Sequence, residues 1–403
     1  MTTIRVVGGA IGEQLPAPVL VVLGVGALCA HYRPRWRVAL ACASGLIALA
    51  MVNPVFSVYF TALVAALTWT RLRARPFIVV LVAAAILAPK SAFSFRYHQP
   101  GYWNWINEPS LTLALLVSAM WLRRRPRPGT ADPAPSTDPM AFALSYLFPS
   151  HAMNPMPYSP ALLAAEPHLD RRAILVLLGW FVAKALALLA LRAVGPPGFL
   201  SGLGPADVAT LGSGELWGLV IGSYLETYLS LAATADIPVL IGRLFGFRLP
   251  DPFRFALLAW NPIELWRRWG IYNRHVLMQL VYIPLGGGTR RKYLNVLLTF
   301  LASALVLHSG WFGSKYWHVG AAGWRDQSVY FLLQGVGVCV CLAVSEWTGE
   351  KQNGRLRPSM SVGLVAAVLA TQTWSALVHV VILAQKVELS DRARLVARCL
   401  GIV

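Results

Sequence analysis

The chain has 403 residues, of which 57% are apolar and 13% are charged, and apolar runs of about bilayer-spanning length recur along it. This composition excludes an ordinary soluble globular protein and predicts an all-α polytopic membrane protein. The formal charge of +18 does not indicate nucleic-acid binding, because the basic residues lie in short clusters between apolar runs, as the positive-inside rule describes.

The basic clusters predict which loops face the cytoplasm. We expect a multi-pass protein of the cell (inner) membrane, with the lipid bilayer as its surroundings and with the first span retained rather than cleaved as a signal. The five cysteines have neither the spacing nor the histidine partners of a metal site, so no metal is expected. The clusters are Arg33, Arg35 and Arg37, then Arg71, Arg73 and Arg75, then Arg123, Arg124, Arg125 and Arg127, and then Arg171 and Arg172.

The apolar runs and their Gly and Pro breakers predict the membrane segments. Runs at residues 141–149, 236–246 and 273–285 fall below the roughly 20 residues that a perpendicular helix needs, so re-entrant or tilted segments are expected there. The sequence therefore predicts about ten or eleven transmembrane helices. The remaining runs lie near residues 17–31, 38–52, 55–70, 76–89, 110–122, 173–192, 213–232, 293–312, 326–346 and 361–384.

Composition also divides the chain into four parts. Residues 1–122 are expected to form peripheral N-terminal transmembrane helices. Residues 123–140 are rich in proline and almost free of apolar side chains, which predicts a flexible cytoplasmic loop. Residues 141–346 hold all the motifs and form the expected core, and residues 347–403 form a C-terminal transmembrane helix and tail.

A polar cassette at residues 261–308 stands out from the apolar background. It contains Asn261 to Gly270 (NPIELWRRWG), Tyr282 to Gly288 (YIPLGGG), a basic patch from Arg290 to Lys292, and an apolar stretch that ends at His308. Ionisable groups at hydrocarbon depth cost several kcal/mol. The cassette is therefore expected to bind something in the membrane or to make it react.

Within the cassette Glu264 stands three and four residues before Arg267 and Arg268, the spacing of ion pairs on one helix face. Farther upstream Glu226 lies between Tyr224 and Tyr228. Its carboxylate could orient a catalytic base or bind a polar acceptor, or it could pair with a Lys or Arg of a neighbouring helix.

Three motifs resemble the membrane-bound O-acyltransferases, with the alginate O-acetyltransferase branch as the nearest. They are Gly242 to Pro250 (GRLFGFRLP), Trp266 to Trp269 (WRRW) and Tyr282 to Gly287 (YIPLGG). Weaker similarities lie upstream, and together the motifs cover about residues 141–315 in family order. The weaker ones are Leu147 to Pro149 with Asn154 to Met156 and Tyr158, and Gly179 with Lys184.

The resemblance implies a ring of helices, with re-entrant segments, around a membrane-crossing tunnel. An acyl-CoA, acetyl-CoA in the nearest branch, would enter from the cytoplasm as donor substrate, with no bound cofactor. A hydroxyl acceptor would meet it beside a buried histidine. If the acyl group is exported, a separate periplasmic acetyl-transfer partner would have to receive it.

His308 matches the family's histidine. The stretch from Ser303 to His308 (SALVLH) is similar to the family's Ser-Gly-Leu-Trp-His, with the tryptophan lost and one extra residue. A neutral imidazole there could act as general base on the acceptor hydroxyl. The alternative is a histidine that only donates a hydrogen bond to a neighbouring helix. His275, His318 and His379 are expected to be structural or interfacial.

The chain departs from the family directly after the Trp-Arg-Arg-Trp element. Gly270 stands where the family usually has a histidine, and glycine has no side chain that can donate, accept or titrate. Three explanations remain open: Asn273 or His275 takes the place of the lost histidine, or the acceptor differs, or the chain no longer transfers acyl groups. The candidate catalytic residues are therefore His308, His275 and Asn273.

The Trp-Arg-Arg-Trp element has two interpretations. Arg267 and Arg268, with Trp266 and Trp269, could grip the phosphates of the acyl-CoA, because guanidinium groups match phosphate geometry. They could also be anchors at the membrane interface, where tryptophan and arginine are frequent. The glycine-rich element has two as well, since its free backbone groups could line a tunnel or simply form a loop.

Two functions follow. The first is a membrane O-acyltransferase that moves an acyl group, acetyl by expectation, from acyl-CoA to a hydroxyl of a polysaccharide, a lipid or a secreted metabolite, with His308 as general base. The alternative is a non-catalytic relative that acts as a membrane transporter or scaffold.

Overall fold

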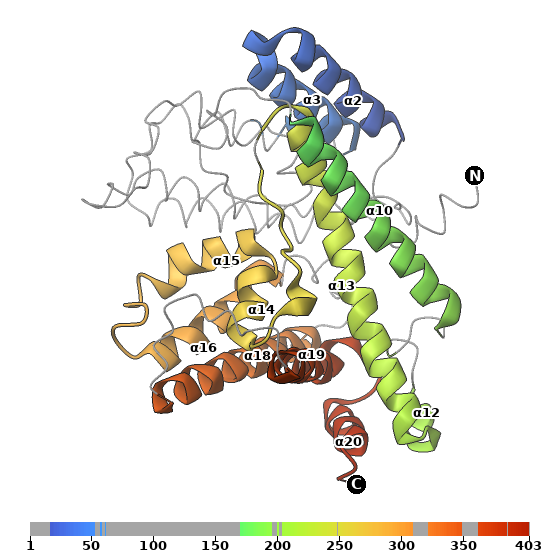
Figure 1. Ribbon diagram of the computed structural model, residues 1–403, viewed down its shortest axis with the longest axis vertical. Helices are drawn as coiled ribbons and strands as arrows, with labels where there is room; N and C mark the ends of the chain where they lie inside the picture. Colours follow the sequence, from blue (N-terminus) through green and yellow to red (C-terminus); the bar gives the residue numbers. More distant parts are fainter. Residues whose placement is uncertain are drawn as a thin grey trace. The chain divides into compact units, whose positions relative to one another are not determined.

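The computed structural model describes residues 17–52, 57, 58, 61, 170–195, 200, 204–247, 249–308, 321–348, 362–384 and 386–402. Every regular element in these ranges is a helix, and none is a strand (Figure 1). The elements are α2 (Ala17–Tyr32), η2 (Pro34–Trp36), α3 (Arg37–Val52), α10 (Arg171–Val194), α12 (Pro205–Thr210), α13 (Ser213–Leu244), η3 (Ala256–Leu258), α14 (Pro262–Arg268), α15 (Ile271–Leu277), η4 (Met278–Tyr282), α16 (Lys292–Ala302), η5 (Ser303–His308), α18 (Ala321–Trp347), α19 (Val362–Leu383) and α20 (Leu389–Cys399).

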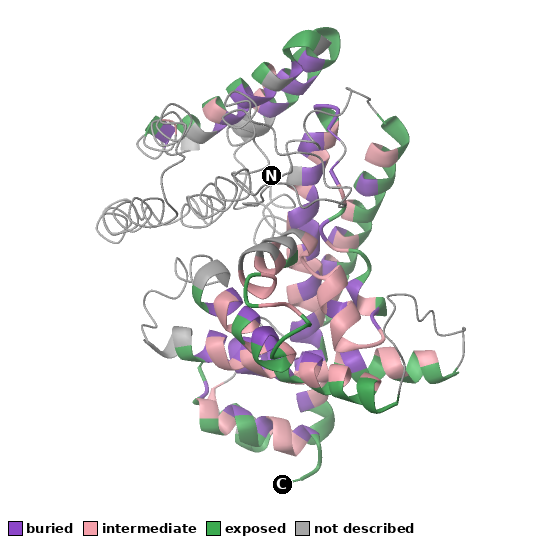
Figure 2. Cartoon of the chain, turned by 90° about the vertical axis from the view of Figure 1, so that its left-hand side faces the viewer, coloured by how far each residue is buried: buried purple, intermediate pink, exposed green. Residues whose placement is uncertain are grey.

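Three of the described helices are long and apolar enough to cross a membrane: Arg171–Val194, Arg325–Trp347 and Val362–Leu383. Much of their apolar surface faces outward, as Figure 2 shows by burial class. On α10, for example, Leu175, Leu186 and Trp180 are exposed. Exposed apolar side chains on this scale suit lipid rather than water. An all-helical, multi-pass membrane chain is therefore supported, while the full number of crossings stays a prediction.

Hydropathy located five of the described α-helices to within about five residues at each end. The runs near 17–31, 38–52, 173–192, 326–346 and 361–384 correspond to α2, α3, α10, α18 and α19. The runs near 76–89, 110–122 and 141–149, most of the run near 55–70, the loop at 123–140 and the weak motifs at 147–158 lie outside the described residues.

One expectation about the membrane segments was wrong. Residues 213–232 and 236–246 were expected to form two segments, the second of them re-entrant or tilted, but α13 runs unbroken from Ser213 to Leu244. The residues around the expected break are buried: Ala232, Ala233 and Asp236 are at most 1% exposed. Because these small side chains are packed inside the protein, the helix continues through a stretch whose hydropathy alone predicted a break.

The chain divides into two compact units. One holds Met1–Ala183 with Ala233–Asp251, and the other holds Lys184–Ala232 with Pro252–Val403. In the first unit, α2 and α3 form a pair joined by η2. Their close approach requires Gly26, because a side chain there would collide with Ser44.

The end of α13 explains the motif from Gly242 to Pro250 in structural terms. Gly246 has φ +85°, and the amides of Gly246 and Phe247 bond back to the carbonyls of Arg243 and Gly242. This is a glycine-terminated helix end. The Arg243 guanidinium donates to the Leu249 carbonyl at 2.8 Å and to Asp251 Oδ1 at 2.7 Å, so the chain that leaves the helix is held in place.

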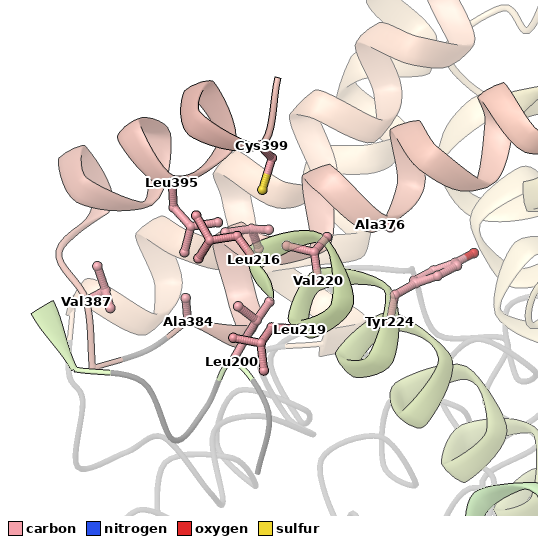
Figure 3. Packing of buried hydrophobic residues seen from close by; sticks show 11 residues of the cluster. Leu200, Leu216, Leu219, Val220, Tyr224, Ala376, Ala384, Val387, Leu395 and Cys399 are labelled. Atoms are coloured by element: carbon pink, nitrogen blue, oxygen red, sulfur yellow. The ribbon is translucent and has the colours of Figure 1, made fainter. Parts of the chain in front are cut away.

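The core of the second unit joins the first half of α13 to α19 and α20. Leu216, Val220 and Tyr224 of α13 pack with Ala376 of α19 and Leu395 of α20, and Figure 3 shows Leu395 directed toward Leu216. The docking of α20 is also polar: Trp217 Nε1 donates to the Cys399 carbonyl at 2.7 Å, and Arg398 donates to the Leu211 carbonyl. The C-terminal helix is thus an integral part of this unit.

Candidate functional site

The Trp-Arg-Arg-Trp element lies on α14 and is placed by a capped helix start. The Asn261 side chain accepts a hydrogen bond from the Glu264 amide at 2.7 Å, and Pro262 occupies the first helical position. Both features favour a helix beginning at this residue. The helix is only seven residues long. The residue at which it begins therefore determines on which sides of the helix the two arginines and two tryptophans lie.

The two arginines of α14 share one carboxylate. Arg267 Nη1 lies 2.7 Å from Glu264 Oε1, and Arg268 Nε lies 3.4 Å from Glu264 Oε2, which confirms the predicted local pairing. The Arg268 guanidinium also lies over the Trp260 ring at 4.7 Å. Arg274 lies within electrostatic range of Glu264 and Arg267. Three arginines therefore lie near one acidic side chain, which leaves the cluster net positive.

The two tryptophans of the element point into the protein. Trp266 packs against Phe300 and Phe331, with ring centroids 5.2 and 5.9 Å away, and its Nε1 donates to Gln334 Oε1 at 3.4 Å. Trp269 packs among Tyr228, Phe253 and Tyr224. These contacts assign both rings to the helix core of the second unit.

His379 of α19 completes the aromatic cluster around Trp269. Its ring is 2% exposed and lies 4.9 Å from the Tyr224 ring, 4.8 Å from the Tyr330 ring and 5.8 Å from the Trp269 ring. His379 Nδ1 lies 2.7 Å from the Ser375 carbonyl oxygen and Nε2 lies 3.0 Å from the Tyr330 hydroxyl. Because a carbonyl only accepts, Nδ1 carries the proton, and in the neutral ring Nε2 accepts from Tyr330.

The sequence predicted only a structural or interfacial role for His379, which lies outside the cassette in the last predicted span. The available signal was a lone ionisable residue in a strongly apolar run, which marks a functional candidate in a membrane segment. Nothing local in the sequence indicates that α19 packs against α14.

The predicted catalytic residues occupy α15 and η5. Asn273 and His275 lie on α15, one turn after the Trp-Arg-Arg-Trp element, and His308 is the last residue of η5. The side chains of His275 and His308, and all of His318, lie outside the described part of the structure. The assignment of a catalytic role to His308 or His275 thus stays a prediction.

The backbone conformation of Gly270 explains why this residue is a glycine. Its φ is +56°, which L side chains rarely adopt, and a Cβ built on it would lie 4.0 Å from Asn273 Nδ2. A histidine at this position would therefore strain the backbone. The Asn273 amide already lies beside the place where a side chain at 270 would begin, which is consistent with Asn273 as a replacement polar group.

The extra residue before His308 also has a structural counterpart. Residues Ser303–His308 form a π-helix directly after the α-helix Lys292–Ala302. A π-turn is the way a helix accommodates one additional residue without ending, and such turns are frequent at functional sites. The helix therefore continues to His308 despite the extra residue.

The glycine-rich element is held as a loop by Asn295 of α16. Asn295 Nδ2 lies 3.1, 2.9 and 2.7 Å from the carbonyl oxygens of Leu285, Gly287 and Arg290. Gly286 and Gly287 have φ of +104° and +57°. These hydrogen bonds give the loop carbonyls a donor from the protein itself. The conformation of the loop is therefore explained by the protein's own contacts.

The other acidic side chain noted in the sequence, Glu226, pairs with a basic residue of a neighbouring helix. Arg192 of α10 lies 2.7 Å from Glu226 Oε1, so the pairing interpretation is the one observed. Among the described residues no group of three or more His, Cys, Asp or Glu side chains could hold a metal ion.

Comparison with known proteins gives partial, distant matches. No protein-family model matches the chain. It is 29% identical over 137 residues, 33% of its length, to the "Peptidoglycan O-acetyltransferase" of Helicobacter pylori. It is 28% identical over 116 residues, 28% of its length, to the "Probable alginate O-acetylase AlgI" of Pseudomonas putida, and 27% identical over 116 residues to that of Pseudomonas aeruginosa. The matches cover 23%, 23% and 21% of these relatives, so the chain matches less than a quarter of each.

Proposed function

We propose, from the premise that this chain is a distant and partial homologue of the membrane-bound O-acyltransferases, that it is itself such an enzyme. It moves an acyl group, acetyl by preference, from acyl-CoA to a hydroxyl of a polysaccharide, a lipid or a secreted metabolite. The observation that carries the proposal is the orientation of α14. Its two arginines form a net positive cluster, while its two tryptophans face a buried polar core.

The arginine cluster supports an acyl-CoA as donor. The side chains of Arg267 and Arg268 are 38% and 23% exposed, which leaves them accessible to a ligand although both contact Glu264. Guanidinium groups recognise phosphate oxygens through paired N–H donors. A coenzyme A carries a diphosphate and a further phosphate, so it is the kind of donor that this cluster suits.

In the proposed reaction His308 acts as general base. The unprotonated ring nitrogen of His308 takes the proton of the acceptor hydroxyl as its oxygen forms a bond to the thioester carbonyl carbon. The carbon–sulfur bond then breaks, and the leaving thiolate takes the proton back from the imidazolium. General base catalysis of this kind is worth about 100- to 10,000-fold in rate.

The experiment is acyl-CoA turnover by purified protein in nanodiscs with acetyl, butyryl and palmitoyl donors. We expect turnover with the wild type and a fall of at least about 100-fold in His308→Ala. His31→Ala is the matched control, since His31 is an exposed histidine of α2. Absence of wild-type turnover with every donor, after addition of cell-extract acceptors, would overturn the proposal.

The second function that the sequence allows, a non-catalytic transporter or scaffold, depends on Gly270. Glycine has no functional side chain, and the positive φ at this position disfavours any residue that has one. Under this alternative the protein would bind acyl-CoA without consuming it, so binding measured together with turnover distinguishes the two.

A further inference from the structure

His379 plays no part in the reaction proposed above, yet it is a buried polar side chain held on every side. Three aromatic rings, those of Tyr224, Tyr330 and Trp269, surround it within 5.8 Å. Both of its nitrogens are engaged, Nδ1 with the Ser375 carbonyl and Nε2 with the Tyr330 hydroxyl. Because both ring nitrogens are hydrogen-bonded, the ring is held in one orientation and has no free nitrogen with which to exchange a proton.

A purely packing role for this position would not require a histidine. Placing an ionisable residue in a membrane helix costs free energy that a leucine would not, even where the ring remains neutral. The hydrogen bonds offset that cost and fix the ring about its two side-chain torsions. A histidine at this position thus provides a ring of fixed orientation, which a leucine would not.

The ring that His379 orients belongs to the Trp-Arg-Arg-Trp element. Trp269 directly follows Arg268, and its amide bonds to the Leu265 carbonyl, closing the last turn of α14. The Tyr224 ring stacks on Trp269 at 6.2 Å with an interplanar angle of 18° and touches His379 from another side. Trp269 is therefore held between two residues, each fixed by hydrogen bonds of its own.

The helix α19 also holds the chain just before α14. Gln372 Nε2 donates to the carbonyls of Ala256 and Ala259 at 3.1 and 3.4 Å, and Gln372 Oε1 accepts from the Tyr224 hydroxyl at 2.7 Å. Gln372 and His379 are two helical turns apart, so one face of α19 contacts both the segment leading into α14 and the residue at its end. Between these two contacts lie Arg267 and Arg268.

We propose that His379 is the positioning residue of the donor site: by fixing Trp269 it sets where Arg267 and Arg268 meet the phosphates of the acyl-CoA. This inference rests on the proposed function for the identity of the ligand. Because His379 acts through Trp269, it affects the affinity for the donor and leaves the proton transfer at His308 unchanged.

The test compares His379→Leu with Gly337→Ala. The leucine variant fills the space without hydrogen bonds or aromatic contacts. Gly337 lies in α18, and a Cβ there would meet Trp374 Nε1 of α19 at 2.7 Å. Its alanine variant therefore disturbs the packing between α18 and α19 without touching Trp269. Gly337→Ala therefore controls for general loosening of the core.

Two quantities are measured for each variant in nanodiscs: the Kd of a non-hydrolysable thioether analogue of acetyl-CoA, and the kcat and KM of acetyl-CoA turnover. For His379→Leu we expect Kd and KM to rise about tenfold, the effect of losing about 1.4 kcal/mol of binding, with kcat within about threefold of wild type. For Gly337→Ala we expect a lower melting temperature with little change in Kd.

Three results would overturn the inference: an unchanged Kd in His379→Leu, an equal rise of Kd in both variants, or a fall of kcat alone. Rescue adds a further check. His379→Gln retains an acceptor for the Tyr330 hydroxyl and should recover part of the affinity. Analogue binding by a wild type that shows no turnover would reject the proposed catalysis while still testing the role of His379.

Discussion

Arg392 of α20 forms a buried ion pair with Asp326 of α18. Its Nη1 lies 2.6 Å from Asp326 Oδ2, and the two side chains are only 5% and 10% exposed. Arg392 also donates to the carbonyls of Val387 and Val381. The arginine thus joins the C-terminal helix to the start of one candidate span and the end of another.

Removal of one partner of this ion pair should be costly. Arg392→Met leaves the buried Asp326 carboxylate with Arg325, which is 54% exposed, as a remaining ion-pair partner at 3.0 Å. The loss should therefore lie at or below the about 3–5 kcal/mol that an uncompensated buried charge costs. We expect a clear fall in the melting temperature of the detergent-solubilised protein. Arg394→Met is the control, because Arg394 is 76% exposed and pairs with Asp391 on the surface, where such pairs contribute about 0–1 kcal/mol. Equal melting temperatures for the two variants would contradict a stabilising role for the buried pair.

The arginines of α14 should affect donor binding more than chemistry. Arg268→Gln removes a charge-assisted donor, so we expect the KM for acyl-CoA to rise about tenfold or more, since such hydrogen bonds contribute about 1.5–3 kcal/mol. Steady-state kinetics at low and high salt would measure this, and the increase should shrink as salt screens the charges. Arg290→Gln, on an exposed loop residue, serves as the control. A fall of kcat at unchanged KM would argue against phosphate recognition.

Gly270→His should not restore a family-like site. The φ of +56° at this position makes any L side chain unfavourable by about 1–2 kcal/mol. We therefore expect lower stability and no gain in turnover, measured by thermal melting and acetyl-CoA hydrolysis. Gly270→Ala separates the backbone strain from the effect of the imidazole. Faster turnover in the histidine variant would show that this position can present a functional side chain.

Asn295 should control the order of the glycine-rich loop. Asn295→Asp retains the size of the side chain but removes the Nδ2 donors that hold the carbonyls of Leu285, Gly287 and Arg290. These hydrogen bonds are part-buried, and loss of a typical intramolecular hydrogen bond costs about 0.5–1.5 kcal/mol. Hydrogen exchange of residues 282–291 should accelerate, while exchange in α19 should remain as in the wild type. Unchanged exchange in the loop would mean that the glycines alone hold its shape.

The sequence by itself predicted the features that depend on residues near one another in the chain. Apolar runs located α10, α18 and α19, because bilayer-length helices need only a local stretch of apolar side chains. The spacing of Glu264 before Arg267 and Arg268 predicted their pairing, because residues three and four apart share one face of a helix. The motif resemblance was confirmed by distant, partial homology to O-acetyltransferases.

Only the tertiary structure decided which distant residues meet. The continuity of α13 through Asp236 depends on burial that hydropathy does not record, and the positive φ of Gly270 depends on the turn that follows α14. The contact between His379 and Trp269 joins residues on two helices far apart in the chain, and no local pattern encodes such a distance. Side-chain packing between helices brings these two residues together. The same packing places residues of α19 beside the arginines and tryptophans of α14, which form the candidate donor site.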